Sequence, residues 1–158
     1  MGPMNYEVRA FSWEDINNYF DQIVEMQREN IYEFHYPEKE PKIEYIVAKL
    51  RELENYLNKG NSHFIGALKE GELCGYIWCY ESVFLDEKRM NINSLFVREK
   101  DRQSGVGHLL VNEIKAIASN SGCVSIATHY ASFNTAAGAF YKKNGFDVTR
   151  IEVVCKLK

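Results

Sequence analysis

The sequence predicts a single domain, residues 1–158, of the mixed α+β class, and three observations lead to that prediction. A chain of 158 residues has the usual length of one domain. Its composition, 46% hydrophobic and 26% charged, is typical of a globular protein with a packed core. Its apolar residues switch between helical and strand spacing in the order β-α-α-β-β-β-α-β-α-β. An antiparallel meander followed by a β-α-β unit distinguishes this order from a doubly wound sheet.

The first 60 residues are predicted to be mostly helical. Ser12, with Asp15 three residues later, indicates the start of a helix after a short alternating strand. Pro37 and Pro41 interrupt the helical pattern and indicate a loop, and Gly60 ends the pattern that follows. The expected elements are a strand at 6–11, a helix from 12 to about 26, a loop around 37–41 and a helix at 43–57.

After residue 60 the apolar spacing changes to that of strands. Two apolar runs flank Glu70-Gly71, which is a hairpin signal, and a charged turn precedes a third run. Gly145 follows a helical segment in the position of a C-terminal cap. The expected elements are strands at 63–69, 73–81 and 91–97, a helix at 105–119, a strand at 123–127, a helix at 134–144 and a strand at 146–157.

Composition excludes several classes of protein. A net charge of −3 gives no basic footprint for nucleic acid, and no apolar run approaches the roughly 20 residues that span a bilayer. Residues 1–3 look like a remnant of cloning, and no signal peptide follows them. The four cysteines form no CxxC pair and have no ligand-spaced histidine, so we expect buried, reduced thiols and no metal. These features suggest a cytoplasmic protein that contacts neither nucleic acid nor membrane.

The most informative segment is the polar loop that follows residues 95–97. Gly105 and Gly107 stand where a helix begins, and glycines there let a ligand approach the backbone closely. Free N–H groups at a helix start favour an anion such as pyrophosphate, and Arg102 adds a positive charge. The segment has neither the Lys-Ser or Lys-Thr of a Walker A loop nor the third glycine of a Rossmann loop.

This segment resembles the acyl-CoA-binding motif, (R/Q)xxGx(G/A), of the GCN5-related N-acetyltransferases, the GNAT family. Arg102, Gly105 and Gly107 fill that pattern after the strand Leu95-Phe96-Val97. Residues 134–146, an Asn, small residues, an aromatic-Tyr pair and a closing Gly-Phe, resemble the family's second motif. The two motifs together are more specific than either alone. The resemblance covers about residues 62–158 and implies a mostly antiparallel twisted sheet of about six or seven strands with about four helices.

The resemblance also implies a cofactor, acetyl-CoA, and the residues that would bind it. In the family the pantetheine arm lies between two strands that splay apart and pairs with exposed backbone. The main chain of Leu95, Phe96 and Val97 is expected to make those contacts, with Asn134 beside the pantetheine. The pyrophosphate is expected to contact Arg102, Gln103, Ser104, Gly105, Val106, Gly107 and His108.

The implied reaction is direct attack of a neutral primary amine on the acetyl thioester in a ternary complex, without a metal or a covalent intermediate. A backbone N–H near Leu95 or Phe96 would stabilise the oxyanion. The hydroxyl of Tyr141 is the expected proton donor to the departing thiolate. The alternative for Tyr141 is packing only, since Phe140 and Tyr141 point about 100° apart on a helix and cannot share one face.

The sequence offers more than one candidate for the general base. Many family members carry Glu in the strand before the loop, but here Asn93 stands at that position and can only hold a water. Glu81, at the end of the preceding strand, is the expected substitute, with a solvated strand end as the alternative. His129 is a further candidate because it follows a strand end near the expected site.

The acceptor is expected to be a small-molecule amine, with a polyamine-like compound favoured over a peptide terminus. Segment 29–40 mixes aromatic residues with Glu29, Glu33, Glu38 and Glu40, which suits a cationic ligand. The aromatic candidates for this wall are Tyr32, Phe34, His35 and Tyr36 from the segment, joined by Trp78, Tyr80 and Phe84.

Two other functions fit the same sequence. An acyl-CoA sensor without catalysis would explain Asn93, and a different acyl donor or a peptide acceptor would use the same cofactor loop. The resemblance further implies a homodimer as one arrangement, with the strand at 146–157 paired either across subunits or within one.

Overall fold

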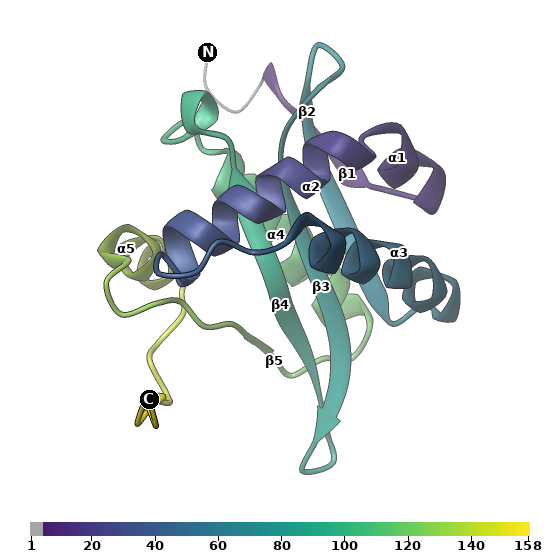
Figure 1. Cartoon of the computed structure of the whole chain (residues 1–158). Coiled ribbons are helices and arrows are strands. Elements are labelled where there is room, and N and C mark those ends of the chain that lie inside the picture. The colour runs from purple at the N-terminus through teal and green to yellow at the C-terminus, as the bar shows by residue number, and fades with distance from the viewer. Residues whose placement is uncertain (1–4) are drawn as a thin grey trace.

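A five-stranded sheet in the order β1-β2-β3-β4-β5 forms the centre of the computed structural model, which describes residues 5–158 (Figure 1). The expected cloning remnant, residues 1–3, lies outside the described residues. Strands β1 to β4 pair antiparallel, whereas β5 pairs parallel to β4. The strands are β1 (Glu7–Ala10), β2 (Ser62–Lys69), β3 (Glu72–Phe84), β4 (Glu87–Val97) and β5 (Ser125–Ala127). The expected mixed α+β fold class is confirmed.

Helices cover both faces of this sheet. In Figure 1, α1, α2 and α3 lie in front of the strands and α4 lies behind them, while α5 stands beside β4. The first helix begins as expected, because Ser12 and Asp15 form a reciprocal capping box. The helices are α1 (Trp13–Asn18), α2 (Phe20–Glu29), α3 (Ile43–Lys59), α4 (Val106–Asn120) and α5 (Thr135–Lys143), with short turns η2 (Asn30–His35) and η3 (Glu99–Asp101).

Two apolar cores fill the layers, one on each face of the sheet. Strand alternation sends Phe64 and Trp78 toward α2 and α3, and sends Ile65 and Cys79 toward α4. The same alternation decides which side chains of β3 and β4 reach each face farther along the strands. The candidate site therefore depends on the sheet register.

The structure corrects the expected elements in three places. The helix expected from residue 12 is interrupted at Tyr19, and the loop after it contains the π-helical turn η2. The β3–β4 hairpin extends to Phe84 and Glu87, so it projects past the rest of the sheet (Figure 1). Residues 147–158 form no strand and are exposed throughout, which leaves five strands where six or seven were expected.

The cysteines are all free, but they are not all buried as expected. Cys74 and Cys79 are buried, Cys123 is partly buried, and Cys155 is exposed on the C-terminal segment. Within residues 5–158 no helix combines the length and apolar character that a membrane span requires.

Candidate active site

The gap between β4 and β5 is the first feature of the site. Arg89, Met90 and Asn91 of β4 pair with β5, and beyond them β4 continues to Val97 without a partner on that side. A slot of about 60 Å³ opens where the strands part. Its lining residues include Ile92, Asn93, Ser94 and Leu95 from β4, Thr128, His129 and Tyr130 after β5, and Asn134, Ala137 and Tyr141 at α5. Three expected cofactor residues, Leu95, Asn134 and Tyr141, thus border one slot.

Asn93 sits at an irregularity of β4. Trp78 pairs with Ser94 and Cys79 pairs with Ile92, so Asn93 is an extra residue in the β4 ladder. A β-bulge of this kind redirects a side chain and is common beside active sites. Asn93 is exposed and borders the slot.

The start of α4 has the properties of an anion site. Gly105 precedes the helix with a φ of 94°, a conformation that favours glycine, and no side chain caps the helix start. The first turn of α4 carries no acidic residue. Its N–H groups therefore have no side-chain cap competing with a phosphate. Gln103 also has a positive φ, and the Ser104 hydroxyl donates to the Asp101 carbonyl, so these two residues shape the loop.

Two side chains expected to hold the pyrophosphate are engaged elsewhere. Arg102 donates from Nε to the Val97 carbonyl at 2.7 Å and from its terminal nitrogen to Glu29 at 3.3 Å. Its guanidinium lies 5.0 Å from the Phe34 ring centroid. His108 contacts Asn144 through Nδ1 at 2.5 Å and Asn112 through Nε2 at 3.1 Å. Arg102 and His108 therefore help to hold the loop and α4 in place.

Asp101 fixes the loop before α4 through its side-chain contacts. Its carboxylate is 4% exposed and accepts hydrogen bonds from the Tyr6 hydroxyl at 2.6 Å and from the Arg98 guanidinium. Arg98 also pairs with Glu72 at 2.6 Å. Burial raises the pKa of Asp101, but the bonds from Arg98 and Tyr6 outweigh it, and the pKa lies below its ordinary value.

Replacing Asp101 with Asn is expected to destabilise the fold by about 1–3 kcal/mol, because Arg98 loses its charged partner. Tyr6→Phe, which removes one donor only, should cost about 0.5–1.5 kcal/mol. Because the folded pKa is lowered, the contribution of Asp101 is present above the unfolded pKa and is lost as pH falls through the folded value. Urea unfolding at neutral and acidic pH measures both effects, and equal stability of wild type and Asp101→Asn at pH 7 would contradict them.

Gly107 allows α4 to pack closely against α5, in addition to letting a ligand approach the backbone. A Cβ built on Gly107 would lie 2.9 Å from the Phe140 ring, so α4 and α5 approach closely there. Replacing Gly by Ala inside a helix normally stabilises by about 0.5–1 kcal/mol. Here Gly107→Ala is expected to destabilise by about 1–3 kcal/mol through overpacking.

Thermal unfolding tests the sign of this change. The double variant Gly107→Ala with Phe140→Leu should recover part of the loss, because the smaller side chain yields space. Ser119→Ala, on an exposed position of α4, serves as the helix control and is expected to stay within about 0.5 kcal/mol. An increase in stability of Gly107→Ala would contradict the close packing.

Tyr141 is buried between aromatic side chains at the end of the slot. It is 9% exposed, stacks on Tyr130 at 6.0 Å between ring centroids, and meets Phe140 and Phe146 edge-on. Burial raises the pKa of Tyr141 to about 12, and the Thr128 hydroxyl only partly offsets this. The phenol therefore keeps its proton at neutral pH and can donate it in a hydrogen bond.

A second and larger cavity, of about 580 Å³, adjoins the slot between the sheet and the α2–α3 layer. Its aromatic wall is partly as expected, since His35, Tyr36, Trp78 and Tyr80 line it. Phe84 does not, because it lies at the exposed end of the β3–β4 hairpin. Four further residues on α3, at helical spacing, were missed by the sequence analysis: Tyr45, Lys49, Glu52 and Tyr56.

The expected acidic wall from segment 29–40 is not formed. Glu29 pairs with Arg102, Glu40 with Arg28, and Glu38 with Lys156. None of these carboxylates lines the large cavity, where Glu52 lies 3.9 Å from Lys49. The cavity wall therefore combines tyrosine and tryptophan with neutral polar side chains, and both of its carboxylates, Glu52 and Glu81, lie near a lysine.

The slot and the large cavity meet at one place. Asn30, His35, Asn93, Ser94 and His129 border both. The His35 and His129 rings lie 6.5 Å apart, edge to face. Burial, aided by the nearby His129, lowers the pKa of His35 below its ordinary value, so His35 is neutral at pH 7. The lowered pKa makes His35 a weaker proton acceptor than an ordinary histidine.

Glu81 is placed differently from what its expected role as base requires. Its carboxylate accepts from His63 at 2.7 Å and from Lys88 at 3.1 Å. Although Glu81 borders the large cavity, its side chain alternates with that of Tyr80 and shares the α4 face with Cys79. Burial raises the pKa of Glu81, but the bonds from His63 and Lys88 lower it by more, so the pKa lies below its ordinary value. These contacts make Glu81 a bound anion and a poor proton acceptor.

A buried polar group lies at the inner wall of the large cavity. Gln27 is 6% exposed, and its Nε2 has no hydrogen-bond partner among the described residues. Beside it, Ser94 Oγ contacts the Tyr76 hydroxyl at 2.8 Å and accepts from Asn30 at 3.2 Å. Buried donors are normally paired, so Gln27 suits a ligand atom that accepts a hydrogen bond. No cluster of three or more metal-ligating side chains occurs in the part of the chain that the structure describes.

Comparison with known proteins supports this geometry. The model of the acetyltransferase (GNAT) family matches residues 23–146. Tyramine N-feruloyltransferases 4/11 and 10/30 of Nicotiana tabacum are each 32% identical over 78 residues, which are 48% of this chain and 34% of the relative. The chain thus spans about a third of the length of these curated relatives.

Solved structures share the whole architecture. An aminoglycoside acetyltransferase, meta-AAC0020, from an uncultured soil metagenomic sample aligns with a TM-score of 0.73 and 18% identity, covering 99% of each chain. The aminoglycoside N-acetyltransferase AAC(6')-Iy, in complex with CoA, aligns with a TM-score of 0.75 and 15% identity, covering 96% of this chain and 93% of that one. At such low identity the likeness establishes the fold.

Proposed function

Because the chain belongs to the acetyltransferase (GNAT) family, we propose that it transfers an acetyl group from acetyl-CoA to a primary amine by direct attack in a ternary complex. The observation that carries this proposal is the meeting of a narrow slot and a large aromatic cavity at one junction. A thioester in the slot and an amine in the cavity would come together there, as a reaction without a covalent intermediate requires.

The cofactor side of the site fits acetyl-CoA. The unpaired edge of β4 beyond Asn91 offers backbone groups to the pantetheine amides, in the manner of an added strand. The uncapped start of α4 offers N–H groups to the pyrophosphate. A backbone N–H near Leu95 would stabilise the oxyanion that forms when the amine attacks.

Two side chains would carry the protons. Tyr141 borders the slot, and its raised pKa keeps it protonated, so it donates to the thiolate as the carbon–sulfur bond breaks. His129 borders both cavities and takes the proton that the amine loses, while the neighbouring His35 stays neutral at pH 7. Asn93 holds a water at the same junction and thereby links the amine to the base.

The acceptor that fits best is a small amine with an aromatic body and a single positive charge. Tyr36, Tyr45, Tyr56, Trp78 and Tyr80 line the cavity, and aromatic rings bind both flat apolar groups and a cation. A polycationic acceptor would need several free carboxylates, whereas Glu52 is near Lys49 and Glu81 is paired with His63 and Lys88. The names of the Nicotiana relatives also point to an aromatic amine as acceptor.

Mass spectrometry of acetyl transfer to a panel of amines tests the proposal. Tyramine and phenethylamine are expected to be acetylated faster than spermidine, an aminoglycoside or a short peptide. Parallel assays with propionyl-CoA and feruloyl-CoA test the acyl group. Intact acetyl-CoA with every amine, despite measurable CoA binding, would support an acyl-CoA sensor and contradict the enzyme.

A further inference from the structure

A serine hydroxyl lies where the slot and the large cavity meet, and the reaction proposed above gives it no role. Ser94 borders both spaces and is only partly buried. Its Oγ contacts the Tyr76 hydroxyl at 2.8 Å and accepts a hydrogen bond from Asn30 Nδ2 at 3.2 Å. What this hydroxyl can do for a ligand depends on where its own hydrogen points.

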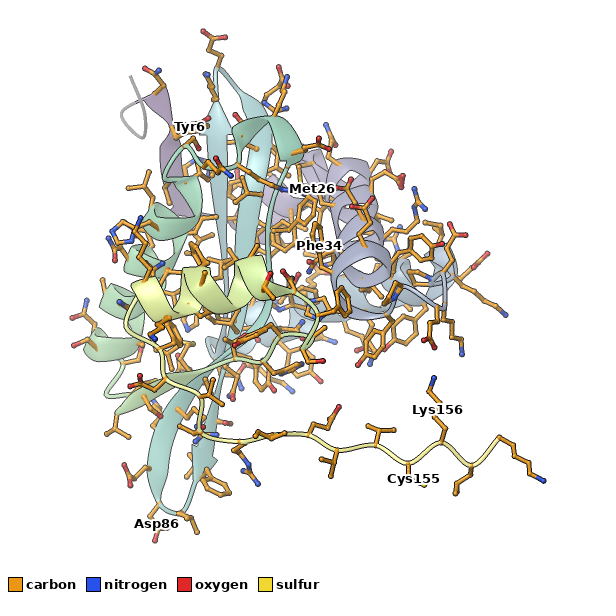
Figure 2. The ribbon with its side chains drawn as sticks, turned by 90° about the vertical axis from the view of Figure 1, so that its left-hand side faces the viewer. Tyr6, Met26, Phe34, Asp86, Cys155 and Lys156 are labelled. Atoms are coloured by element: carbon orange, nitrogen blue, oxygen red, sulfur yellow. The ribbon has the colours of Figure 1, made fainter. Side chains whose placement is uncertain are left out.

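The β-bulge at Asn93 brings Ser94 to the junction. Ile92 packs on the α4 side of the sheet, and in a regular strand the residue two positions later would point the same way. Because Asn93 is an extra residue, Ser94 instead pairs with Trp78 and shares the α2 side. Figure 2 shows the two helical layers on opposite sides of the strands, with Phe34 on the side of α2 and α3. The bulge thus turns the hydroxyl toward the large cavity.

Burial decides the direction of the hydrogen bond between Tyr76 and Ser94. Tyr76 is 0% exposed, and burial raises its pKa, so the phenol keeps its hydrogen and no water can accept it. The other polar side chain that acts on this phenol is Gln27, whose buried Nε2 is itself a donor. Ser94 Oγ is therefore the acceptor for the Tyr76 hydrogen, because the opposite direction would leave a buried O–H unpaired.

The two bonds that Ser94 accepts direct its own hydrogen outward. A serine oxygen has two lone pairs and one hydrogen, and here Tyr76 and Asn30 occupy both lone pairs. Asn30 is 7% exposed, so the surrounding protein holds its side chain in place. The remaining O–H of Ser94 has no further acceptor within the described residues 5–158 and can bond to a molecule in the slot or the cavity.

We propose that Ser94 is a catalytic donor whose hydroxyl bonds to the carbonyl oxygen of the acyl thioester and stabilises the oxyanion that forms there; the inference rests on the proposed acetyl transfer. As the amine nitrogen bonds to the carbonyl carbon, the π electrons of the C=O bond move to oxygen. Ser94 and the backbone N–H near Leu95, the next residue, share that charge. The C=O bond then re-forms, the C–S bond breaks, and Tyr141 supplies the proton to sulfur. Ser94 keeps its hydrogen throughout, and Tyr76 and Asn30 are positioning residues.

Kinetics of Ser94→Ala and Ser94→Thr test the donor role. Ser94→Ala is expected to lower kcat about 10²-fold, the usual effect of losing one oxyanion donor, whereas Ser94→Thr keeps the hydroxyl and should stay within about fivefold of wild type. The affinity for acetyl-CoA, measured by calorimetry, should change little in either variant. Because Ser94→Ala leaves the Tyr76 hydroxyl unpaired, the double variant with Tyr76→Phe removes that buried group and should show the same loss of kcat. Ser82→Ala is the matched control, since it removes a hydroxyl that accepts from Asn91 at 2.8 Å outside both cavities.

Infrared spectroscopy supplies a readout that a purely structural role would not move. With acetyl-CoA isotopically labelled at the carbonyl carbon, the C=O stretch of the bound thioester is expected at lower frequency than in solution. The shift should be smaller in Ser94→Ala and retained in Ser94→Thr. It needs no turnover, so it tests Ser94 even when no amine is acetylated, a result that would contradict the proposed function alone. Equal frequencies in wild type and Ser94→Ala, or a kcat of Ser94→Ala within about threefold of wild type, would overturn the donor role.

Discussion

Replacing Tyr141 by phenylalanine is expected to lower kcat by about 10²- to 10³-fold, the usual contribution of a general acid. The phenyl ring keeps the stacking on Tyr130 and the edge contacts to Phe140 and Phe146, so the slot should keep its shape. What is lost is the proton that stabilises the departing thiolate. Steady-state kinetics with acetyl-CoA and the best amine of the panel measures the loss, and calorimetry measures the affinity for acetyl-CoA, which should change little.

A matched control separates this loss from the general effect of removing a tyrosine hydroxyl. Tyr19→Phe removes a hydroxyl that donates to the Gly71 carbonyl at 2.7 Å, far from the slot, and should leave kcat unchanged. Because the pKa of Tyr141 is raised to about 12, the donor stays protonated across the usual assay range and should produce no alkaline loss of kcat there. A kcat reduced less than about threefold in Tyr141→Phe would mean that the thiolate leaves without this proton.

Local signals in the sequence predict most of the fold. The capping box at Ser12 and Asp15 and the turn at Glu70-Gly71 are built from residues close in the chain, and both occur in the structure. Gly60 ends α3 in a left-handed conformation, as glycine at that position indicates. Each of these features depends on backbone and side-chain chemistry within a few residues, and a single sequence contains that information.

The C-terminal strand shows where local information stops. Residues 147–158 have the alternation of a strand and are extended, but a strand exists only when another strand pairs with it. Alternation determines which face is apolar and leaves the partner open. The split of the first helix at Tyr19 is similar in kind, since the Tyr19 hydroxyl bonds to Gly71, which is distant in sequence.

The candidate site likewise has features that local sequence predicts and features that depend on residues distant in the chain. The two motifs identified the loop before α4 and the position of Tyr141, because these depend on glycine conformations and on the order of elements. The contacts of Arg102 and His108 within the protein could not be predicted, because Glu29 and Asn144 come from elements outside the loop motif. Tyr45 and Tyr56 were missed although they lie off the apolar stripe of α3, where exposed tyrosines indicate a binding surface.

Among the candidates for the base, substitution of His129 is expected to have the largest effect. His129→Gln should lower kcat/KM for the amine by about 10²-fold at neutral pH, because the amine proton loses its acceptor. In His35→Gln, kcat/KM should fall by less than about tenfold, because His35 lies beside His129 and is not the proposed proton acceptor.

Glu81→Gln provides the contrast that decides between the two sequence candidates. Its two oxygens accept bonds from His63 and Lys88, and its side chain is 9% exposed, so the variant should lose stability. Its kcat/KM should stay within about threefold of wild type. A loss of about 10²-fold in kcat/KM for Glu81→Gln, with kcat/KM unchanged in His129→Gln, would return the role of base to Glu81. The acidic shift of the Glu81 pKa makes that outcome unfavourable, because a carboxylate held ionised by two donors has little affinity for another proton.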